Sequence, residues 1–118
     1  MWDVQYTDQF HAWWLTLGSG EHDAITYSVG LIEQSGPGLA RPHVDTVAGS
    51  RFQNMKELRV QYRGRPYRIF FAFDPRRSAI LLIGGAKAGK RNFYPKMIRE
   101  ADELYSDYLA ELKKEGLI

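Results

Sequence analysis

Residues 57–73 read ELRVQYRGRPYRIFFAF, and this stretch decides the fold class. Apolar and polar residues alternate along both of its halves, which is the period of a half-buried β-strand. The segment between the halves, Arg63-Gly64-Arg65-Pro66, supplies turn residues. The stretch therefore predicts a β-hairpin with one apolar face and one charged face.

The position of the turn decides which side chains meet across this hairpin. A turn centred on Arg63-Gly64 sets Arg59 directly opposite Arg68, and a turn centred one residue later makes the two arginines diagonal on the same face. A one-residue slip of the register would set apolar side chains against charged ones, so either way the arginines share a face. Like charges paired across strands cost up to about 1 kcal/mol. An anion held between the arginines would turn this repulsion into binding; alternatively, Glu57 or a helix carboxylate bridges them.

The N-terminal segment predicts one strand and two helices. Residues 2–6 alternate like a half-buried strand, and Thr7 can cap a helix whose apolar residues extend to Leu17. A second helix is predicted from about residue 21 to residue 34, ended by Ser35-Gly36-Pro37-Gly38. Because only a few residues join the two helices, we expect them to form an antiparallel helical hairpin.

The remaining segments complete a β-α-α-β-β-β-α order. Residues 37–54 have no clear period and are interpreted as a long connection. Residues 79–83 are apolar on both faces, as in a central strand, and Gly84-Gly85 is expected to break it. Residues 94–112 carry apolar residues at helical spacing and predict a long C-terminal helix. We therefore expect an α+β fold with a mainly antiparallel sheet, in one domain spanning residues 1–118.

The formal net charge of +2 hides a strong segregation of sign. Residues 1–40 contain no Lys or Arg, residues 41–91 contain twelve Lys and Arg against three acidic residues, and residues 92–118 are again slightly acidic. Such a basic block predicts a surface that faces a polyanion, unless the acidic helices neutralise it.

Two further properties of the composition exclude classes of protein. The chain has no cysteine, which excludes a disulfide framework, a Cys-ligated zinc and a thiol nucleophile. No apolar run approaches the ~18 residues of a membrane span, and the acidic, aromatic N-terminus is unlike a signal peptide. We therefore expect a cytoplasmic protein with no membrane partner.

Three segments in combination point to a known family. They are residues 54–59 (NMKELR), residues 64–77 (GRPYRIFFAFDPRR) and residues 83–89 (IGGAKAG). This combination resembles the RelE/ParE toxin superfamily, specifically its phage-derived HigB-like branch, and the resemblance covers nearly the whole chain. The chain departs from other HigB-like toxins after residue 86, where Lys87 and then Lys90-Arg91 replace an adjacent Lys-Lys-Thr.

The resemblance implies a RelE-like fold and the toxin of a bacterial type II toxin–antitoxin pair. Its HigB-like and RelE-like members cut mRNA, usually in the ribosomal A site, with no metal or other cofactor. The RNA 2′-hydroxyl attacks the neighbouring phosphate and a cyclic phosphate forms. The implied partners are mRNA, the ribosome and a small helix-turn-helix antitoxin of the HigA type. ParE-like relatives instead poison DNA gyrase, and a non-enzymatic phage RNA-binding module is a third interpretation, because the fold alone does not fix the activity.

Cleavage through the 2′-hydroxyl requires an in-line geometry and stabilised charge on the phosphate. Arginines would hold the phosphate through forked donors and lysines would add point charge. His43 has an intrinsic pKa suited to acid–base catalysis, and Tyr94 is a second candidate, as a hydrogen-bond donor or a stacking platform for a base. The expected catalytic residues are thus Arg59, Arg68, Lys87, Lys90, His43 and Tyr94, and the expected RNA-binding residues are Arg51, Lys56, Arg65 and Arg91.

Overall fold

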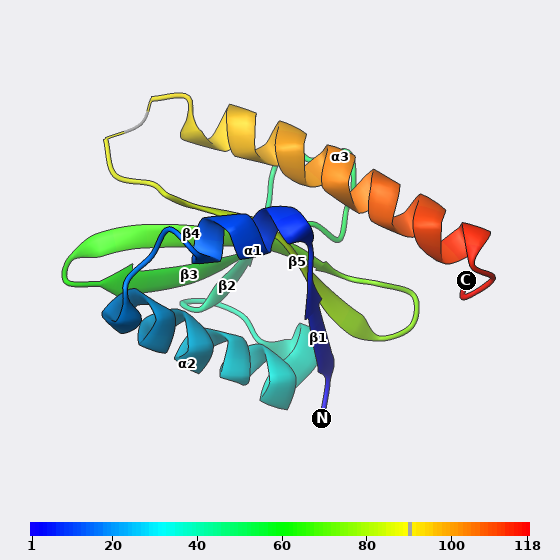
Figure 1. Ribbon diagram of the computed structural model, residues 1–118, viewed down its shortest axis with the longest axis horizontal. Helices are drawn as coiled ribbons and strands as arrows, with labels where there is room; N and C mark the ends of the chain where they lie inside the picture. The colour runs from blue at the N-terminus through cyan, green and yellow to red at the C-terminus, as the bar shows by residue number, and fades with distance from the viewer. Residues whose placement is uncertain (90) are drawn as a thin grey trace.

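The computed structural model describes residues 1–89 and 91–118 and has a mixed α+β architecture (Figure 1). Its elements in chain order are β1 (Asp3–Tyr6), α1 (Asp8–Trp14), α2 (Ser19–Ser35), the short 3-10 helix η1 (Gly36–Gly38), β2 (Val44–Thr46), β3 (Lys56–Tyr62), β4 (Arg65–Phe73), β5 (Ser78–Ala86) and α3 (Phe93–Lys114). Within the described residues, five strands form one sheet in the order β1-β5-β4-β3-β2. Only β1 and β5 pair in parallel, so the predicted α+β class with a mainly antiparallel sheet is confirmed, and it is compatible with a RelE-like fold.

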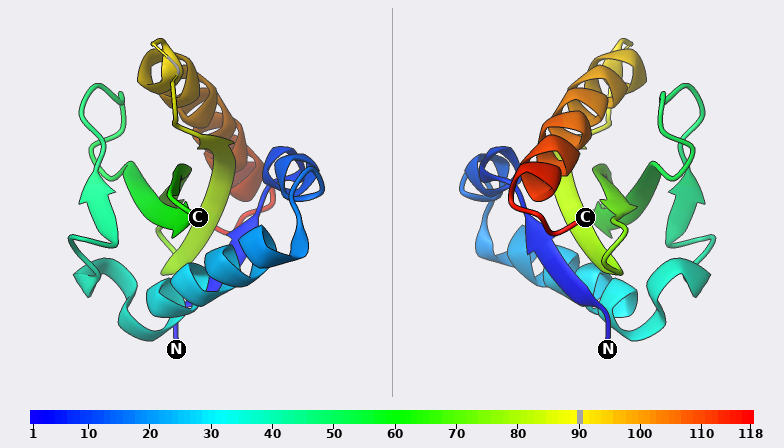
Figure 2. Two further views of the ribbon diagram at one scale, coloured as in Figure 1. Left: turned by 90° about the vertical axis from the view of Figure 1, so that its left-hand side faces the viewer. Right: turned by 90° about the vertical axis from the view of Figure 1, so that its right-hand side faces the viewer.

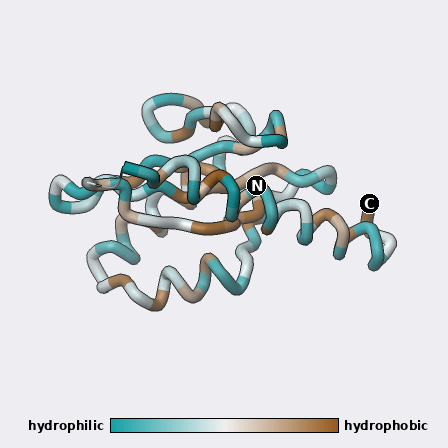
Figure 3. The backbone as a smooth tube through the Cα atoms, turned by 90° about the horizontal axis from the view of Figure 1, so that it is seen from above, coloured by the Kyte–Doolittle hydropathy of each residue, from teal (hydrophilic) through white to brown (hydrophobic). Residues whose placement is uncertain are grey.

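Helices cover the two faces of the sheet unequally (Figure 2). Helix α1 packs on β5 and α2 packs on β3, both on one face, and Figure 1 shows these two helices running in opposite directions, as expected. The long helix α3 lies on the other face, over β4 and β5. The most apolar stretches of backbone lie near the centre of the molecule (Figure 3). Because α3 does not extend over β3, part of that face is left open.

Thr7 ties the start of α1 to the sheet. Its hydroxyl accepts a hydrogen bond from the Phe10 N–H at 3.0 Å, which is the predicted N-cap, and donates one to the Leu82 carbonyl at 2.6 Å. The helix ends at Trp14 and not near Leu17, and α2 already begins at Ser19. The carboxylate of Glu21 causes this early start, because it accepts the N–H of Gly18 at 2.9 Å and caps the helix there.

The β3–β4 hairpin adopts the first of the two predicted registers. Arg63 and Gly64 have φ values of 51° and 76°, so both occupy the left-handed region that a two-residue type I′ turn requires. This turn sets Arg59 directly opposite Arg68, with the apolar pairs Leu58–Ile69 and Val60–Tyr67 on the other face.

Two expectations about the strands are wrong. The segment 37–54 is not only a connection, because β2 pairs with β3 over residues 44–46. Gly84 and Gly85 do not break the strand, because β5 continues through them to Ala86. Aromatic and sulfur-containing side chains fill the space beside them: the Trp13 ring lies against Gly84, and Phe93 and Met97 lie against Gly85.

No helix within residues 1–89 or 91–118 combines the length and the apolar character needed to cross a membrane.

Candidate functional site

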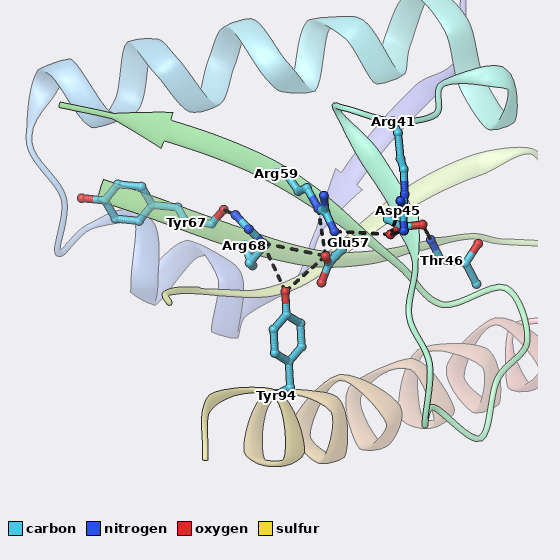
Figure 4. A network of polar contacts seen from close by, with 8 residues as sticks. All are labelled: Arg41, Asp45, Thr46, Glu57, Arg59, Tyr67, Arg68 and Tyr94. Carbon is cyan, nitrogen blue, oxygen red and sulfur yellow. Dashed lines mark hydrogen bonds and ion pairs between the residues drawn. The ribbon is translucent and has the colours of Figure 1, made fainter. Parts of the chain in front are cut away.

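Arg59 and Arg68 define the candidate site on the open part of the sheet. They are paired residues of β3 and β4 and point to the same face, towards Tyr94 in the first turn of α3 (Figure 4). The Arg68 side chain is 10% exposed and the Arg59 side chain is 35% exposed. One guanidinium is therefore held within the protein, while the other is partly open to solvent.

Glu57 bridges the two guanidinium groups. Its Oε1 accepts the Nε–H of Arg59 at 3.1 Å and lies 3.7 Å from the Nε of Arg68. The Glu57 side chain is only 6% exposed, so this contact lies in a poorly solvated environment where charges interact strongly. The bridging carboxylate that the sequence left as an alternative is thus present, and it offsets the repulsion between the arginines.

Tyr94 joins this pair from the first turn of α3. Its hydroxyl accepts the Nε–H of Arg68 at 3.2 Å and donates to the Oε1 of Glu57 at 3.2 Å. Burial raises the pKa of Tyr94, and the bond to Glu57 acts in the same direction while the bond from Arg68 opposes it. The phenol is therefore neutral at physiological pH and keeps a proton to donate.

Lys87 adds a third cation beside the same tyrosine. Its Nζ lies 5.5 Å from the centre of the Tyr94 ring, a cation–π distance. The backbone N–H of Lys87 donates to the Pro66 carbonyl at 2.9 Å, which fixes the start of the loop after β5 next to β4.

A second carboxylate lies at the other side of Arg59. Asp45, on β2, accepts from the Nη2 of Arg59 at 3.3 Å and from the Nη2 of Arg41 at 2.7 Å. The hydrogen bond from Arg41 is the main reason that the pKa of Asp45 is lowered. The chain Arg41–Asp45–Arg59–Glu57–Arg68 therefore alternates in sign across three strands, and it orients the guanidinium groups.

An open pocket of about 300 Å³ borders the two arginines. Pro42, Arg59, Gln61 and Arg68 line it. The guanidinium donors that Glu57, Asp45, Tyr94 and the Tyr67 carbonyl do not use belong to two residues that border space a ligand can enter. A phosphate group fits this chemistry, because it accepts charge-assisted hydrogen bonds from forked donors.

His43 lies next to Arg59 in the β2–β3 register. Val44 pairs with Leu58, so one residue earlier His43 stands opposite Arg59, and the Arg59 N–H donates to the His43 carbonyl at 2.8 Å. The imidazole is half-buried. Strand alternation places it on the same face as Asp45 and Glu57.

The other predicted cations that the structure describes do not join this cluster. Lys56 follows the alternation of β3 onto the face of Leu58, and Arg65 lines a different cavity, between α1 and α3. Arg51 is held at the middle of α3, where its Nη2 donates to the Asp102 carbonyl at 3.4 Å. Arg91 is exposed in the loop before α3. Lys90 lies outside the described residues.

The sequence indicates Glu57 only as one alternative, a carboxylate that bridges Arg59 and Arg68. In the structure, Glu57 lies at the centre of the cluster. Two signals in the sequence point to it: it lies two positions before Arg59 on a strand, hence on the same face, and it is one of few acidic residues in the basic block. Within the described part of the chain, no group of three or more His, Cys, Asp or Glu side chains is arranged to hold a metal ion.

These features define a small α+β protein with an open pocket lined by two arginines on one face of its sheet. The chain belongs to the phage-derived Gp49-like family (DUF891), whose model matches residues 12–106. It is 45% identical over 103 residues to a Mycobacterium tuberculosis protein named as toxin HigB3, which covers 86% of this chain and 89% of the relative. It is 42% identical over 108 residues to one named as toxin HigB2 in the same organism, which covers 90% of this chain but only 54% of the relative. The resemblance to the HigB-like branch is thereby confirmed.

Proposed function

We propose that this protein is the toxin of a bacterial type II toxin–antitoxin pair and that it cuts RNA without a metal ion. The observation that carries the proposal is the pairing of Arg59 and Arg68 beside an open pocket, with Tyr94 bonded to Arg68. Membership of the Gp49-like family and similarity to proteins named as HigB toxins support the toxin role. The ribosome-bound mRNA is the proposed substrate, and a helix-turn-helix antitoxin is the proposed partner.

In the proposed reaction, the arginines hold the scissile phosphate. Arg59 and Arg68 donate to its non-bridging oxygens, and Lys87 adds positive charge as the pentavalent phosphorane develops. The bond between the 2′-oxygen and phosphorus forms while the bond between phosphorus and the 5′-oxygen breaks. A 2′,3′-cyclic phosphate and a free 5′-hydroxyl are the products.

Two protons move in this reaction. We assign the acceptor of the 2′-hydroxyl proton to His43, because it stands opposite Arg59 in the extended β2–β3 register and imidazole is the side chain most often used for acid–base catalysis. Tyr94 gives a proton to the leaving 5′-oxygen, since its neutral phenol lies against Arg68. Glu57 is a positioning residue, because its carboxylate is already engaged by Arg59 and Tyr94 and lies against Arg68.

Induced expression with transcript 5′-end mapping tests the proposal. We expect the wild type to arrest growth and to create new 5′-hydroxyl ends, and the Arg59→Ala/Arg68→Ala double variant to do neither. Arg63→Ala is the matched control, because Arg63 lies at the tip of the same hairpin, is exposed and contacts the Tyr62 ring at 5.4 Å. Growth arrest with intact transcripts would contradict RNA cleavage, and resistance through a gyrase mutation would then favour the ParE-like activity.

A further inference from the structure

One edge of β5 pairs with β4, and its other edge is paired along only part of its length. Strand β1 pairs with it over Ser78–Leu81. Thr7 then makes the last contacts, donating its N–H to the Leu81 carbonyl at 3.0 Å and its hydroxyl to the Leu82 carbonyl at 2.6 Å. The chain leaves the sheet there to form α1, while β5 continues to Ala86. The last residues of β5 are thus left beyond the end of β1.

The pairing of β5 with β4 shows which backbone groups face this open edge. The Lys87 N–H donates to the Pro66 carbonyl, and Arg68 pairs with Gly85. Hydrogen-bonded pairs alternate along an antiparallel ladder, so Gly85 faces β4 while Gly84 and Ala86 present their N–H and C=O groups to the other side. Among residues 1–89 and 91–118, neither of these two has a backbone partner on that side.

A cavity of about 510 Å³ lies along this edge, between α1 and α3. Trp13 and Leu17 line it from one side of the sheet, and Phe93 and Met97 line it from the other. Gly84, Gly85 and Ala86 also line the cavity, so the unpaired edge of β5 borders space that another backbone can enter. Figure 2 shows α1 and α3 on opposite sides of the end of β5.

We propose that an extended, acidic segment of the cognate antitoxin binds in this cavity as an added strand on Gly84–Ala86, in line with β1. The identity of the partner rests on the proposed toxin function. Two exposed cations, Arg65 and Lys96, line the cavity against one carboxylate, Glu21. Acidic side chains on the added strand would therefore meet a lining with an excess of positive charge.

The alternation of donors and acceptors favours a peptide over an RNA strand. Gly84 and Ala86 each offer one N–H and one C=O, which a peptide backbone satisfies in both directions. A phosphodiester has no donor for the carbonyls. The apolar walls formed by Trp13, Leu17 and Met97 also suit side chains better than a sugar–phosphate backbone.

Amide hydrogen exchange of the toxin, free and bound to the full-length protein encoded by the neighbouring reading frame, tests the proposal directly. We expect exchange at Gly84 and Ala86 to slow at least about tenfold on binding, because their N–H groups gain partners. The Gly85 amide is an internal control, since it already faces Arg68 in the free toxin. A complex in which Gly84 and Ala86 exchange as in the free toxin would overturn the added strand.

Two matched pairs of variants complete the test. Ala86→Pro removes one N–H from the open edge and should weaken antitoxin binding about tenfold, whereas Ala88→Pro, in the exposed turn that follows, should not. Lys96→Glu should weaken binding, whereas Lys113→Glu, at the far end of α3, should not. Equal affinities within each pair would overturn the proposal.

Growth arrest by the free toxin separates this inference from the proposed function. Ala86→Pro and Lys96→Glu should still arrest growth in the absence of the antitoxin, because neither residue borders the pocket of Arg59 and Arg68. If these variants bind the antitoxin normally but lose RNA binding, the cavity serves RNA and the proposal is wrong. If the wild type arrests growth but does not bind this antitoxin, the toxin role stands and the added strand is wrong.

Discussion

The Nε–H of Arg68 donates to the hydroxyl of Tyr94 at 3.2 Å and thereby joins the middle of β4 to the first turn of α3. The same hydroxyl donates to Glu57, so the guanidinium, the phenol and the carboxylate form a closed triangle of polar contacts. In a poorly solvated place such a network fixes each group, because an unpaired member would remain desolvated. The triangle therefore gives the candidate site a defined geometry before any ligand binds.

Removal of the Tyr94 hydroxyl should lower the rate of RNA cleavage without disturbing the fold. We expect Tyr94→Phe to lower the single-turnover rate of RNA cleavage by about 10²-fold or more, since general acid catalysis typically contributes that much. The ring remains, so the packing of Phe70 and Phe93 against it should be preserved. The wild-type rate should not fall between pH 8 and about pH 10, because burial raises the pKa of Tyr94 above its ordinary value near 10. A rate unchanged by the substitution would remove Tyr94 from the reaction.

Glu57→Gln should destabilise the protein as well as inactivate it. The substitution keeps the shape of the side chain but leaves Arg59 and Arg68 facing each other without an anion between them, while Asp45 still contacts Arg59. We expect the free energy of unfolding to fall by about 1–3 kcal/mol, measured by urea denaturation. The control is Glu111→Gln, an exposed position on α3, which should change stability by less than about 0.5 kcal/mol. Equal stability of Glu57→Gln and the wild type would show that the carboxylate does not hold the arginines.

The two arginines should differ in their tolerance of lysine. Arg68 uses Nε to bond Tyr94 and Nη1 to bond the Tyr67 carbonyl at 3.0 Å, and both donors are lost in Arg68→Lys. Arg59 is more exposed and contacts only carboxylates, which an ammonium group can also contact. We therefore expect Arg68→Lys to lower the cleavage rate at least about tenfold more than Arg59→Lys, because the planar fork is not replaced. The opposite order in a cleavage assay would contradict this assignment.

The part of the site that follows from local pattern could be predicted from the sequence. A period of two and a Gly-containing turn were enough to place Arg59 and Arg68 on one face of the hairpin, opposite or diagonal to each other, because a slip would have exposed the apolar face. The structure selects the directly opposite pair. The contact between Glu57 and Tyr94 could not be predicted in this way, since it joins residues 37 positions apart and depends on where α3 crosses the sheet. Local pattern contains no information on that crossing.

The errors in the fold have the same origin. Gly84 and Gly85 have weak strand propensity, but Trp13 and Met97 occupy the space of the missing side chains and keep β5 extended. The three residues of β2 are too few to establish a period, and they form a strand only because β3 offers a partner. Tertiary contacts therefore overrode local preference at both places.

Ionisation of Tyr108, in the C-terminal half of α3, should lower the stability of the protein at alkaline pH. Burial, reinforced by the hydrogen bond to Asp74 at 2.6 Å, raises the pKa of Tyr108 to about 12. In the unfolded chain this phenol titrates near pH 10, so between about pH 10 and pH 12 the folded state keeps a proton that the unfolded state loses. The contribution is thus fully present below pH 10 and is lost as the pH rises towards 12. We expect the free energy of unfolding to decline over this window, and Tyr108→Phe to reduce the slope. Tyr27→Phe, at a residue 69% exposed, should leave the slope unchanged. An identical slope for the wild type and Tyr108→Phe would show that the Asp74–Tyr108 bond does not protect the phenol from ionisation.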